Sequence, residues 1–322
     1  MIIPRPTSGT VRFSGEGLPM IGHPLVRSWV RRHPDREFEQ AADAPAVRRL
    51  LRELDLGPDA YDLSGEDHLN LRVGGGRLVL RSYKPFITRP RILDLQRIRA
   101  GLAEQGLRVA VPIMIGGRSV FRCGSRWAEV EPYLDHQPTR GRPEELFAAL
   151  GRLHRALLRL APPTTSDLRA TYVDPSTLRR WLRRNTAEGA IADPEELEPM
   201  INELGRRWVP AERVQPIHGD PHGENLRQTA DGPVYFDFGG LATAPRTWDL
   251  AVAHAYLLRT PGPRPDPAAL DDAYQRAAQS DLTDRERSAL RVYPVAVALM
   301  YAICGWGEGW RTIARNLLND HR

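Results

Sequence analysis

The sequence predicts an α+β fold in which a small antiparallel sheet precedes a mostly helical part. Four short segments have the alternating apolar pattern and the β-branched and aromatic residues of strands: 61–73, 77–83, 119–121 and 126–130. A helical segment at 89–105 lies between the two pairs, and from Pro143 onward the apolar spacing is mainly that of helices. Grouped strands followed by a run of helices predict separate sheet and helical layers.

The predicted elements have recognisable ends. Residues 46–56 have helical spacing and stop at Gly57-Pro58, and Gly74-Gly75-Gly76 joins the first two strands. Extended sequence flanks this triplet on both sides, which favours a hairpin turn over a cradle for phosphate. The later helices are expected at 143–160, 175–186, 194–208, 246–259, 268–280 and 284–304. One strand-rich patch, 213–238, interrupts them.

The composition is that of an ordered globular protein. Of the 322 residues, 41% are hydrophobic, which is enough for a sizeable core in two domains or two lobes. The start lacks the basic segment and apolar run of a signal peptide, and no run of about 20 apolar residues predicts a membrane span. With only Cys123 and Cys304, neither a disulfide framework nor a cysteine metal site is expected. We therefore expect a cytoplasmic protein without a membrane partner.

The positive charge does not predict a nucleic-acid partner. The formal net charge is +5 and the sequence pI is about 9.5. However, the arginines are scattered through helices and balanced by 40 acidic residues, and no stripe of aromatic and basic residues accompanies them. Lys84 is the only lysine in the chain, so the arginine content reflects a general preference for arginine over lysine. The sequence leaves the oligomeric state open.

The strand-rich patch contains the residues that point to a reaction. It holds His218-Gly219-Asp220-Pro221-His222-Gly223-Glu224-Asn225, a turn, and then Asp237-Phe238-Gly239. The spacing His-x-Asp-x-x-x-x-Asn with a later Asp-Phe-Gly is that of the kinase catalytic loop. Phosphoryl transfer needs one carboxylate for the proton of the nucleophile, and an amide oxygen and a second carboxylate for Mg²⁺. Asp220 is thus the predicted catalytic residue, and Asn225 and Asp237 are the predicted metal ligands.

These motifs resemble those of the aminoglycoside phosphotransferase family, the small-molecule branch of the protein-kinase-like fold. The family's His-Gly-Asp-x-His-x-x-Asn signature is present at 218–225, and its Pro-x-x-x-Asp-Leu-Ala pattern is present at 245–251. Gly151-Arg152-Leu153-His154 is similar to its Leu-His helix, and the resemblance covers about residues 55–260.

The resemblance implies a two-lobed fold with the nucleotide in the cleft between the lobes. Residues 46–131 would form the nucleotide-binding N-lobe, with its small antiparallel sheet. Residues 132–322 would form the mostly helical C-lobe, with the catalytic loop and the substrate site. Residues 1–45 are rich in Pro, Arg and His without a sustained period, and we interpret them as an N-terminal extension.

Several polar residues of the motifs are predicted to be structural. His218 and His222 are expected to hold the loop by hydrogen bonds rather than to move protons. Asp249 is expected to tie its helix to the catalytic loop, and His154 to be a satisfied core histidine. Ligation of zinc or iron by His218, Asp220 and His222 in a hydrolase is an alternative, because these side chains suit both metals, but it leaves the rest of the motif unexplained.

The residues that bind the phosphates are assigned by their position in the first lobe. Ser64 and Gly65 lie between the first two strands, where family members fold a turn over the phosphates. Leu78-Val79-Leu80-Arg81 aligns with the kinase Val-Ala-Ile-Lys, so strand alternation directs Arg81 to the phosphates. Arginine keeps the charge of the usual lysine and binds phosphate bidentately. Lys84 is the alternative, and Asp94 on the following helix is the carboxylate expected to hold Arg81.

The base of the nucleotide is expected at a hinge between the lobes. Glu129 and Glu131 lie in the segment 129–134, whose backbone would bind the base. Pro132 has no N–H, so a neighbouring residue must be the donor. Recognition through the backbone leaves ATP and GTP equally open as phosphoryl donors.

Together these residues predict a Mg²⁺-dependent kinase that moves the γ-phosphoryl group of ATP or GTP onto a hydroxyl of a small molecule. The acceptor would be an antibiotic, in antibiotic resistance, or a metabolite. A protein Ser/Thr kinase is an alternative, but the Ala-Pro-Glu element that should follow Asp237-Phe238-Gly239 is absent. Arg81 in place of lysine motivates a further alternative, a non-catalytic nucleotide-binding module. The His/Asp metallohydrolase is the remaining alternative.

The acceptor is expected between the catalytic loop and residues 160–212. A polycationic acceptor needs carboxylate partners, and the segment offers Asp193, Glu195, Glu196, Glu198 and Glu203. It also carries basic pairs at i, i+4 spacing on one helix face: Arg179, Arg180, Arg183 and Arg184. From sequence this face is either solvated or part of the cleft wall. In the second case, with a net charge of +5, it favours a neutral or anionic acceptor.

Overall fold

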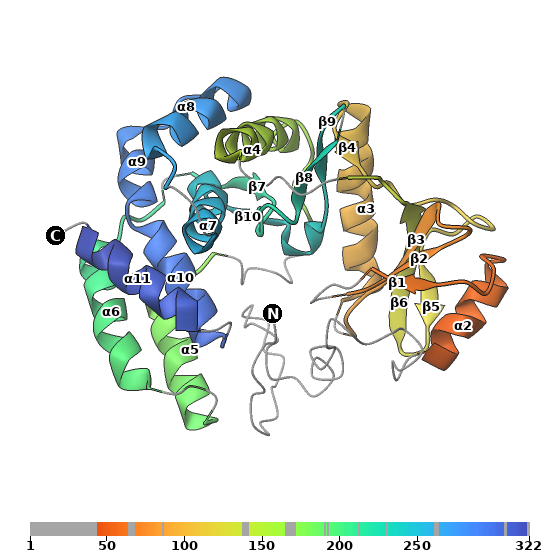
Figure 1. The fold of residues 1–322 in the computed structure, drawn as a ribbon, viewed down its shortest axis with the longest axis horizontal. Helices are drawn as coiled ribbons and strands as arrows, with labels where there is room; N and C mark the ends of the chain where they lie inside the picture. The colour runs from red at the N-terminus through yellow and green to blue at the C-terminus, as the bar shows by residue number, and fades with distance from the viewer. Residues whose placement is uncertain are drawn as a thin grey trace.

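The structure of the chain is a computed structural model with two lobes. It describes residues 44–63, 68–85, 87–136, 142–164, 172–189, 191, 193–211, 213–229, 231–260, 264–305 and 308–320. The predicted extension, 1–45, lies almost entirely outside them, and the predicted lobe boundaries stay predictions. Figure 1 shows a sheet at one side, helices at the other, and one long helix between them. The predicted α+β, kinase-like fold is confirmed.

A five-stranded antiparallel sheet with the order β1-β2-β3-β6-β5 forms the first lobe. Its elements, with the two helices that accompany it, are α2 (Ala44–Glu53), β1 (Tyr61–Asp62), β2 (Leu69–Val73), β3 (Leu78–Ser82), α3 (Arg89–Glu104), β5 (Phe121–Cys123) and β6 (Arg126–Pro132). The central strand β3 carries Arg81, which lies opposite Glu129 of β6 in the register. The sheet therefore brings Arg81 next to the acidic residues of β6.

The glycine triplet is the hairpin turn that the sequence predicted. It connects β2 to β3, and its three φ angles are 59°, 66° and 81°. Only glycine adopts such angles without steric cost.

The second lobe is mainly helical. Its helices are α4 (Pro143–Leu157), α5 (Pro175–Ala187), α6 (Pro194–Arg207), α7 (Arg246–Arg259), α8 (Pro267–Ala278), α9 (Asp284–Leu290), α10 (Tyr293–Ile303) and α11 (Glu308–Asp320). Its short strands are β7 (Gln215–Ile217), which pairs with β10 (Ala242–Ala244), and β8 (Leu226–Thr229), which pairs with β9 (Gly232–Tyr235). β4 (Arg108–Val109) follows α3 in sequence but joins β9 in parallel, so this segment connects the two lobes.

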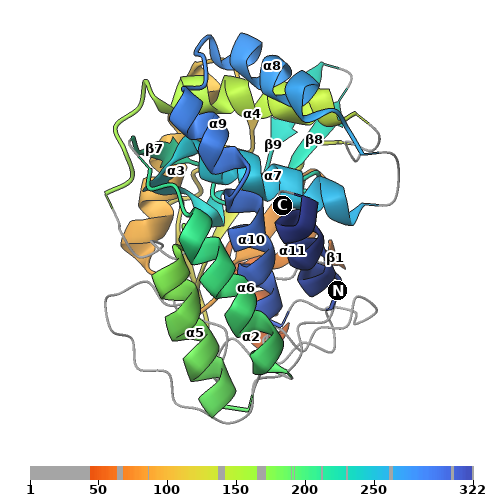
Figure 2. The ribbon, with the colours of Figure 1, turned by 90° about the vertical axis from the view of Figure 1, so that its left-hand side faces the viewer.

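The C-terminal helices differ from the prediction in two places. The helix expected at 284–304 is two helices, α9 and α10, and Pro294 lies in the first turn of α10. Inside a continuous helix this proline would remove a hydrogen bond and clash with the preceding turn. The sequence prediction also lacked α11, although its buried residues Trp310, Ala314, Leu317 and Leu318 recur with helical spacing. Figure 2 shows α5, α6, α10 and α11 packed side by side.

The lobes have separate apolar cores, and α3 belongs to the core of the helical lobe. Leu80 and Val130 are fully buried in the sheet lobe. Leu95, Ile98 and Leu102 of α3 pack instead with α4 and with residues next to the catalytic loop. The polar residues of α3 are therefore held at the boundary between the lobes. None of the described helices is long and apolar enough to cross a bilayer, and the cytoplasmic location stays a prediction.

Candidate active site

One buried carboxylate holds the catalytic loop in place. Asp249, in the first turn of α7, has no exposed surface. One of its oxygens accepts from the Gly219 N–H at 2.8 Å, and the other accepts from the His218 N–H at 2.8 Å and lies 2.9 Å from His154 Nε2. His154 Nδ1 lies 2.9 Å from the Tyr274 hydroxyl. The predicted structural roles of Asp249 and His154 are confirmed.

The two histidines of the loop also have structural contacts. The ring of His218 is fully buried, with Nε2 2.8 Å from the carbonyl oxygen of Phe236. The ring of His222 stacks on Tyr256, with centroids 4.3 Å apart. Burial lowers the pKa of His222, but the neighbouring Asp220 carboxylate outweighs burial, so the pKa is raised. Among the described residues no three His, Cys, Asp or Glu side chains converge as metal ligands would.

The two side-chain oxygens of Asp220 contact different partners at the surface of the loop. Its Oδ1 accepts from the Tyr301 hydroxyl at 3.1 Å, and its Oδ2 lies 3.4 Å from Asn225 Nδ2 and 3.4 Å from His222 Nε2. Asn225 Nδ2 also donates to the backbone carbonyl of Asp220 at 2.9 Å. The Asp220 side chain is 36% exposed, so a ligand hydroxyl can reach it.

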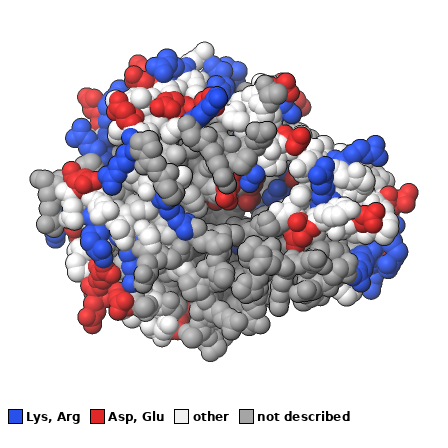
Figure 3. Space-filling model, in the orientation of Figure 1, with Lys and Arg blue, Asp and Glu red and all other residues white. Residues whose placement is uncertain are grey.

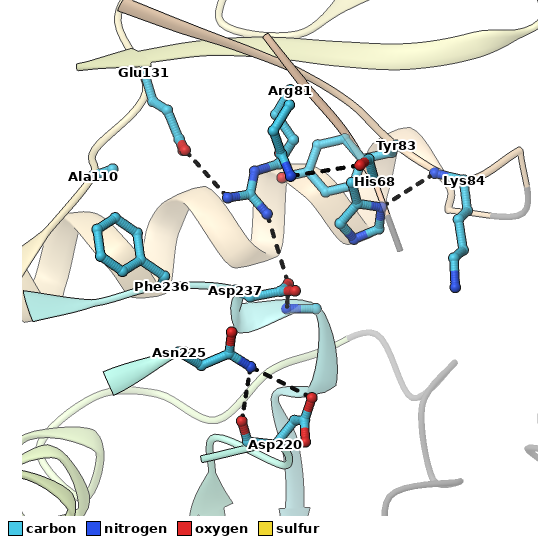
Figure 4. Close-up of polar contacts among 12 residues, drawn as sticks. His68, Arg81, Tyr83, Lys84, Ala110, Glu131, Asp220, Asn225, Phe236 and Asp237 are labelled. Atoms are coloured by element: carbon cyan, nitrogen blue, oxygen red, sulfur yellow. Dashed lines mark hydrogen bonds and ion pairs between the residues drawn. The ribbon is translucent and has the colours of Figure 1, made fainter. Parts of the chain in front are cut away.

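Asp237 and Asn225 come together from the ends of β9 and the catalytic loop. Asp237 has a left-handed backbone, with φ 51°, and its Oδ1 accepts from the Gly239 N–H at 3.3 Å. Figure 4 shows the amide nitrogen of Asn225 directed at Asp220 and its oxygen directed toward Asp237. The amide oxygen and the carboxylate thus face the same space.

The charge state of Asp237 suits a metal ligand. Burial raises the pKa of Asp237, but His68, Arg81 and His218 together outweigh burial and lower it to about 2. The carboxylate is therefore an anion at neutral pH. An anionic carboxylate beside an amide oxygen is a donor set that a hard cation such as Mg²⁺ prefers, so these residues fit the predicted metal.

Arg81 points from the sheet into the cleft, as strand alternation predicted. Its guanidinium nitrogens lie 3.3 Å from Glu131 Oε1 and 3.6 Å from Asp237 Oδ1, and its side chain is only 11% exposed. Arg81 thus joins β6 of the first lobe to Asp237 of the second, the carboxylate that the sequence predicts as a metal ligand (Figure 4).

The carboxylate that holds Arg81 is Glu131, which corrects the prediction of Asp94. Asp94 instead accepts from Arg97 and from the Thr164 N–H, both at 2.7 Å. Asp94 lies on the face of α3 that meets the segment after α4. The face of α3 that is directed at the sheet carries Gln96 and Arg99 instead.

A buried network of charges connects α3 to β6. Arg99 donates to Glu129 and to Glu131, both at 2.6 Å. Glu129, with no exposed surface, also accepts from the Tyr83 hydroxyl at 2.5 Å and from Gln96 at 2.8 Å. The sequence predicted that a carboxylate on the helix would hold the cation on the strand, and this arrangement is reversed in the structure. The helix supplies a cation, and the neighbouring strand supplies the carboxylates.

A pocket between the lobes collects these side chains. It is lined by Arg81, Tyr83, Leu95, Arg99, Ala110, Glu131 and residues 235–239. The face shown in Figure 3 is hollowed between the lobes, with acidic and basic side chains at the hollow. Among the predicted nucleotide contacts, Ser64 and Gly65 lie outside the described residues.

The hinge begins later than the sequence indicated. β6 continues to Pro132, so Glu129 and Glu131 lie within the strand and their side chains belong to the buried network. Tyr133 is the first residue after the strand, and its N–H donates to the Arg77 carbonyl at 2.8 Å. A contact of the base with the backbone of Glu129 or Glu131 stays a prediction.

Lys84 lies beyond the end of β3, which ends at Ser82. Its backbone N–H donates to His68 Nδ1 at 3.4 Å. Figure 4 shows its side chain on the far side of His68 from Arg81. This position favours Arg81 as the cation next to Asp237.

Sequence reasoning missed three residues that shape the site: Arg91, Arg99 and Tyr301. Arg91 is buried and donates to the carbonyls of Gly239, at 3.3 Å, and Leu241, so α3 also holds the loop after Asp237. Arg91 and Arg99 are spaced by two helical turns on the face that also carries Leu95, and this pattern was the available signal. Tyr301 had no local signal.

These features define the class of the protein: a two-lobed, kinase-like protein with the three polar residues of a kinase catalytic centre in one place. The chain belongs to the phosphotransferase enzyme family, APH, whose family model matches residues 60–291. This agrees with the resemblance that the motifs carry. No protein with curated annotation is detectably similar to the chain in sequence.

Solved structures of the same fold include several small-molecule kinases. Amicoumacin kinase hAmiN, in complex with AMP-PNP and Ca²⁺, has a TM-score of 0.64 at 14% identity, over 84% of this chain and 92% of that one. A microcompartment-associated aminopropanol kinase has a TM-score of 0.63 at 17% identity, over 85% and 93%. Aminoglycoside phosphotransferase APH(3'')-Id from Streptomyces rimosus, in complex with ADP and streptomycin, has a TM-score of 0.52 at 17% identity, over 82% and 99%. At these identities the likeness shows the fold.

We expect the substitution Asp249→Asn to lower the free energy of unfolding by about 3 kcal/mol. Asparagine keeps one acceptor oxygen, but its NH₂ group donates where the other carboxylate oxygen accepted, so the buried N–H of either His218 or Gly219 loses its acceptor. Chemical denaturation measures the loss. Asp272→Asn, at an exposed carboxylate of α8, is the control and should change stability by less than about 0.5 kcal/mol. An effect of Asp249→Asn no larger than the control would contradict the assigned role.

Proposed function

We propose that this protein transfers the γ-phosphoryl group of ATP or GTP to a hydroxyl group of a small molecule in a Mg²⁺-dependent reaction. The observation that carries the proposal is the convergence of Asp220, Asn225 and Asp237 below Arg81 (Figure 4). One carboxylate there is open to an acceptor. The other carboxylate and the amide oxygen face each other as metal ligands would. A non-catalytic module would not need the first carboxylate.

The residues suggest how the reaction proceeds. Mg²⁺, when bound by Asn225 and Asp237, would neutralise charge on the phosphates. The acceptor oxygen forms a bond to the γ-phosphorus while the bond from that phosphorus to the bridging oxygen breaks, and ADP or GDP leaves with the electron pair. Asp220 accepts the proton of the acceptor hydroxyl. Arg81 binds phosphate oxygens with its planar guanidinium.

The similar solved structures support a small molecule as the acceptor. Two of them hold a nucleotide, one with Ca²⁺ and one with the antibiotic streptomycin, and a third is an aminopropanol kinase. Both an antibiotic and a metabolite fit this range, whereas none of these three acts on a protein by its description. The small-molecule reading is therefore preferred over a protein Ser/Thr kinase.

The direct test is transfer of label from ATP or GTP, labelled at the γ-phosphate, to a panel of hydroxylated antibiotics and metabolites. We expect at least one labelled product when Mg²⁺ is present and none after EDTA is added. Calorimetry with Mg²⁺ and either nucleotide serves as a second readout. If no compound, including water, receives the label and neither nucleotide binds, the proposed function is wrong.

We predict that Asp220→Asn lowers turnover by about 10² to 10⁴-fold, because the amide cannot accept the proton of the acceptor. Nucleotide affinity should stay within a few-fold, since Asp220 does not belong to the metal pair. Phosphate release and calorimetry measure the two quantities. Asp231→Asn, at an exposed carboxylate in the β8–β9 turn, is the control. Near wild-type turnover of the Asp220 variant would remove Asp220 from its role.

We predict that Asp237→Ala weakens Mg²⁺-dependent nucleotide binding by more than about tenfold, since a methyl group cannot replace an anionic ligand of a hard cation. Asn225→Ala should act in the same direction. Calorimetry with and without Mg²⁺ separates the metal contribution from direct contacts. Unchanged Mg-nucleotide affinity and unchanged turnover in both variants would rule out the metal assignment.

The charges near the expected acceptor side argue against a polycation. Asp193 and Glu196 of the α6 start pair with Arg311 at 3.6 and 3.8 Å. Glu196 also pairs with Arg315, and Glu203 pairs with Arg206 and Arg207. Figure 1 places α6 at the outer edge of the helical lobe, away from the sheet. Glu195 and Glu198 are exposed on the same helix, so the placement of α6, more than the ion pairs, keeps these carboxylates away from the catalytic loop.

The arginines on the basic face of α5 also contact residues of the helical lobe. Arg179 donates to Asn202 of α6 at 3.3 Å, and Arg180 donates to Thr177 of its own helix at 2.9 Å. Arg184 pairs with Glu188 at 3.1 Å. This favours the solvated-face interpretation, so the expectation of a neutral or anionic acceptor now rests on the placement of the α6 carboxylates and the net charge of +5.

We predict that aminoglycosides such as kanamycin are poor substrates, with kcat/KM below about 10⁴ M⁻¹s⁻¹. The reason is that each ammonium group would lose water without gaining a carboxylate partner. Initial rates with kanamycin are compared with those of neutral and anionic hydroxyl compounds from the same panel. A kcat/KM for kanamycin of about 10⁶ M⁻¹s⁻¹ or more would contradict the charge argument.

A further inference from the structure

The hydroxyl of Tyr301 meets the carboxylate of Asp220 although the two residues lie far apart in sequence. Tyr301 is on α10, near the C-terminus, and its hydroxyl lies 3.1 Å from Asp220 Oδ1. The tyrosine is 8% exposed. Burial raises its pKa well above the usual value, so the phenol keeps its proton and is the donor of this hydrogen bond.

The other oxygen of Asp220 is held from the opposite side. Asn225 Nδ2 and His222 Nε2 both lie 3.4 Å from Oδ2. All three contacts are longer than ordinary hydrogen bonds of their kind, and the contact with the Tyr301 hydroxyl, at 3.1 Å, is the shortest of them. Tyr301 is therefore the nearest group that holds the direction of the carboxylate, and it does so from the side opposite Asn225 and His222.

A column of stacked rings fixes Tyr301 itself. Its ring stacks on Trp310 of α11, with centroids 4.6 Å apart and planes at 25°. It also meets the edge of Tyr256 of α7 at 5.5 Å, and Tyr256 in turn stacks on His222 of the catalytic loop. Trp310 has no exposed surface. These ring contacts limit the motion of the Tyr301 side chain, so its hydroxyl is held next to the loop.

We propose that Tyr301 is a positioning residue for phosphoryl transfer, holding the Asp220 carboxylate in the direction that receives the proton of the acceptor. The proposal rests on the proposed function, because it assigns Tyr301 a part in that reaction. Transfer requires the base, the acceptor oxygen and the γ-phosphorus to be aligned, and a misplacement of about 1 Å costs roughly a hundredfold in rate. The helices on the acceptor side thereby help to set the catalytic geometry.

The test compares Tyr301→Phe with Tyr293→Phe. Both residues lie on α10 and both have hydrogen-bonded hydroxyls, but the Tyr293 hydroxyl donates to the Val209 carbonyl at 2.9 Å and has no part in the loop. We expect Tyr301→Phe to lower kcat by about ten- to a hundredfold with the KM for the nucleotide unchanged. Tyr293→Phe should leave kcat within about twofold. The probe is Mg-ATP with water as acceptor, measured by phosphate release, and then any acceptor found in the panel.

A second measurement separates this inference from the proposed function. The melting temperatures of four forms are compared: wild type, Tyr301→Phe, Asp220→Ala and the double variant. In the wild-type background the loss of the hydroxyl should lower Tm by a few degrees, roughly the size expected for one hydrogen bond to a charged group. In the Asp220→Ala background the hydroxyl keeps only its contact with Tyr256, so Tyr301→Phe should lower Tm by clearly less than in the wild-type background.

Unchanged kcat in Tyr301→Phe, or an equal fall of Tm in both backgrounds, would overturn the inference. A wild-type protein that transfers phosphate to no acceptor, water included, would instead overturn the proposed function. The Tm comparison would still decide whether Tyr301 holds Asp220.

Discussion

The buried carboxylate of Asp249 is the constraint on which the site depends. A charge with no exposed surface persists only when it is hydrogen-bonded, and here the partners are two N–H groups of the catalytic loop and the imidazole of His154. The hydrogen bonds of Asp249 therefore connect α7 to α4 and to the start of the catalytic loop. Asp220 follows directly on this clamped segment, and Asn225 returns to the Asp220 carbonyl at 2.9 Å. The positions of Asp220 and Asn225 thus follow from the hydrogen bonds of one buried carboxylate.

The nucleotide side of the site is held by a second set of buried charges. Arg99 binds two glutamates of β6, one of these binds Arg81, and Arg81 reaches Asp237. Because α3 belongs to the core of the helical lobe, this chain of alternating charges also joins the lobes. Removal of Arg99 would leave the fully buried Glu129 without the cation that pairs with it, which costs more than the pair itself contributes. Arginine at position 81 is consistent with this arrangement, since its fork contacts two carboxylates on different sides.

The parts that sequence predicted are those with a local pattern. The spacing from His218 to Asn225 specifies one loop, strand alternation directs Arg81, and the sheet and the helical spacing follow from periodicity. The partners of these residues depend on packing between distant segments, which has no local pattern. Helix position predicts Asp94 as the partner of Arg81, but the pairing of β3 with β6 places Glu131, two residues from the position opposite Arg81, within 3.3 Å of its guanidinium. Tyr301 lies 81 residues from Asp220, and only the packing of α10 against α7 and α11 brings them together.

Different interactions therefore hold the two sides of the site. The nucleotide side is a network of charges, and such a network tolerates little change because charge must stay balanced. Around Asp220 the holding groups are rings: Tyr256, Tyr301 and Trp310 come from three helices and contact one another by shape. Shape can be altered by neighbouring substitutions without leaving a charge unpaired. The position of the Asp220 carboxylate therefore depends on the packing of rings, whereas the position of Arg81 depends on the balance of charges.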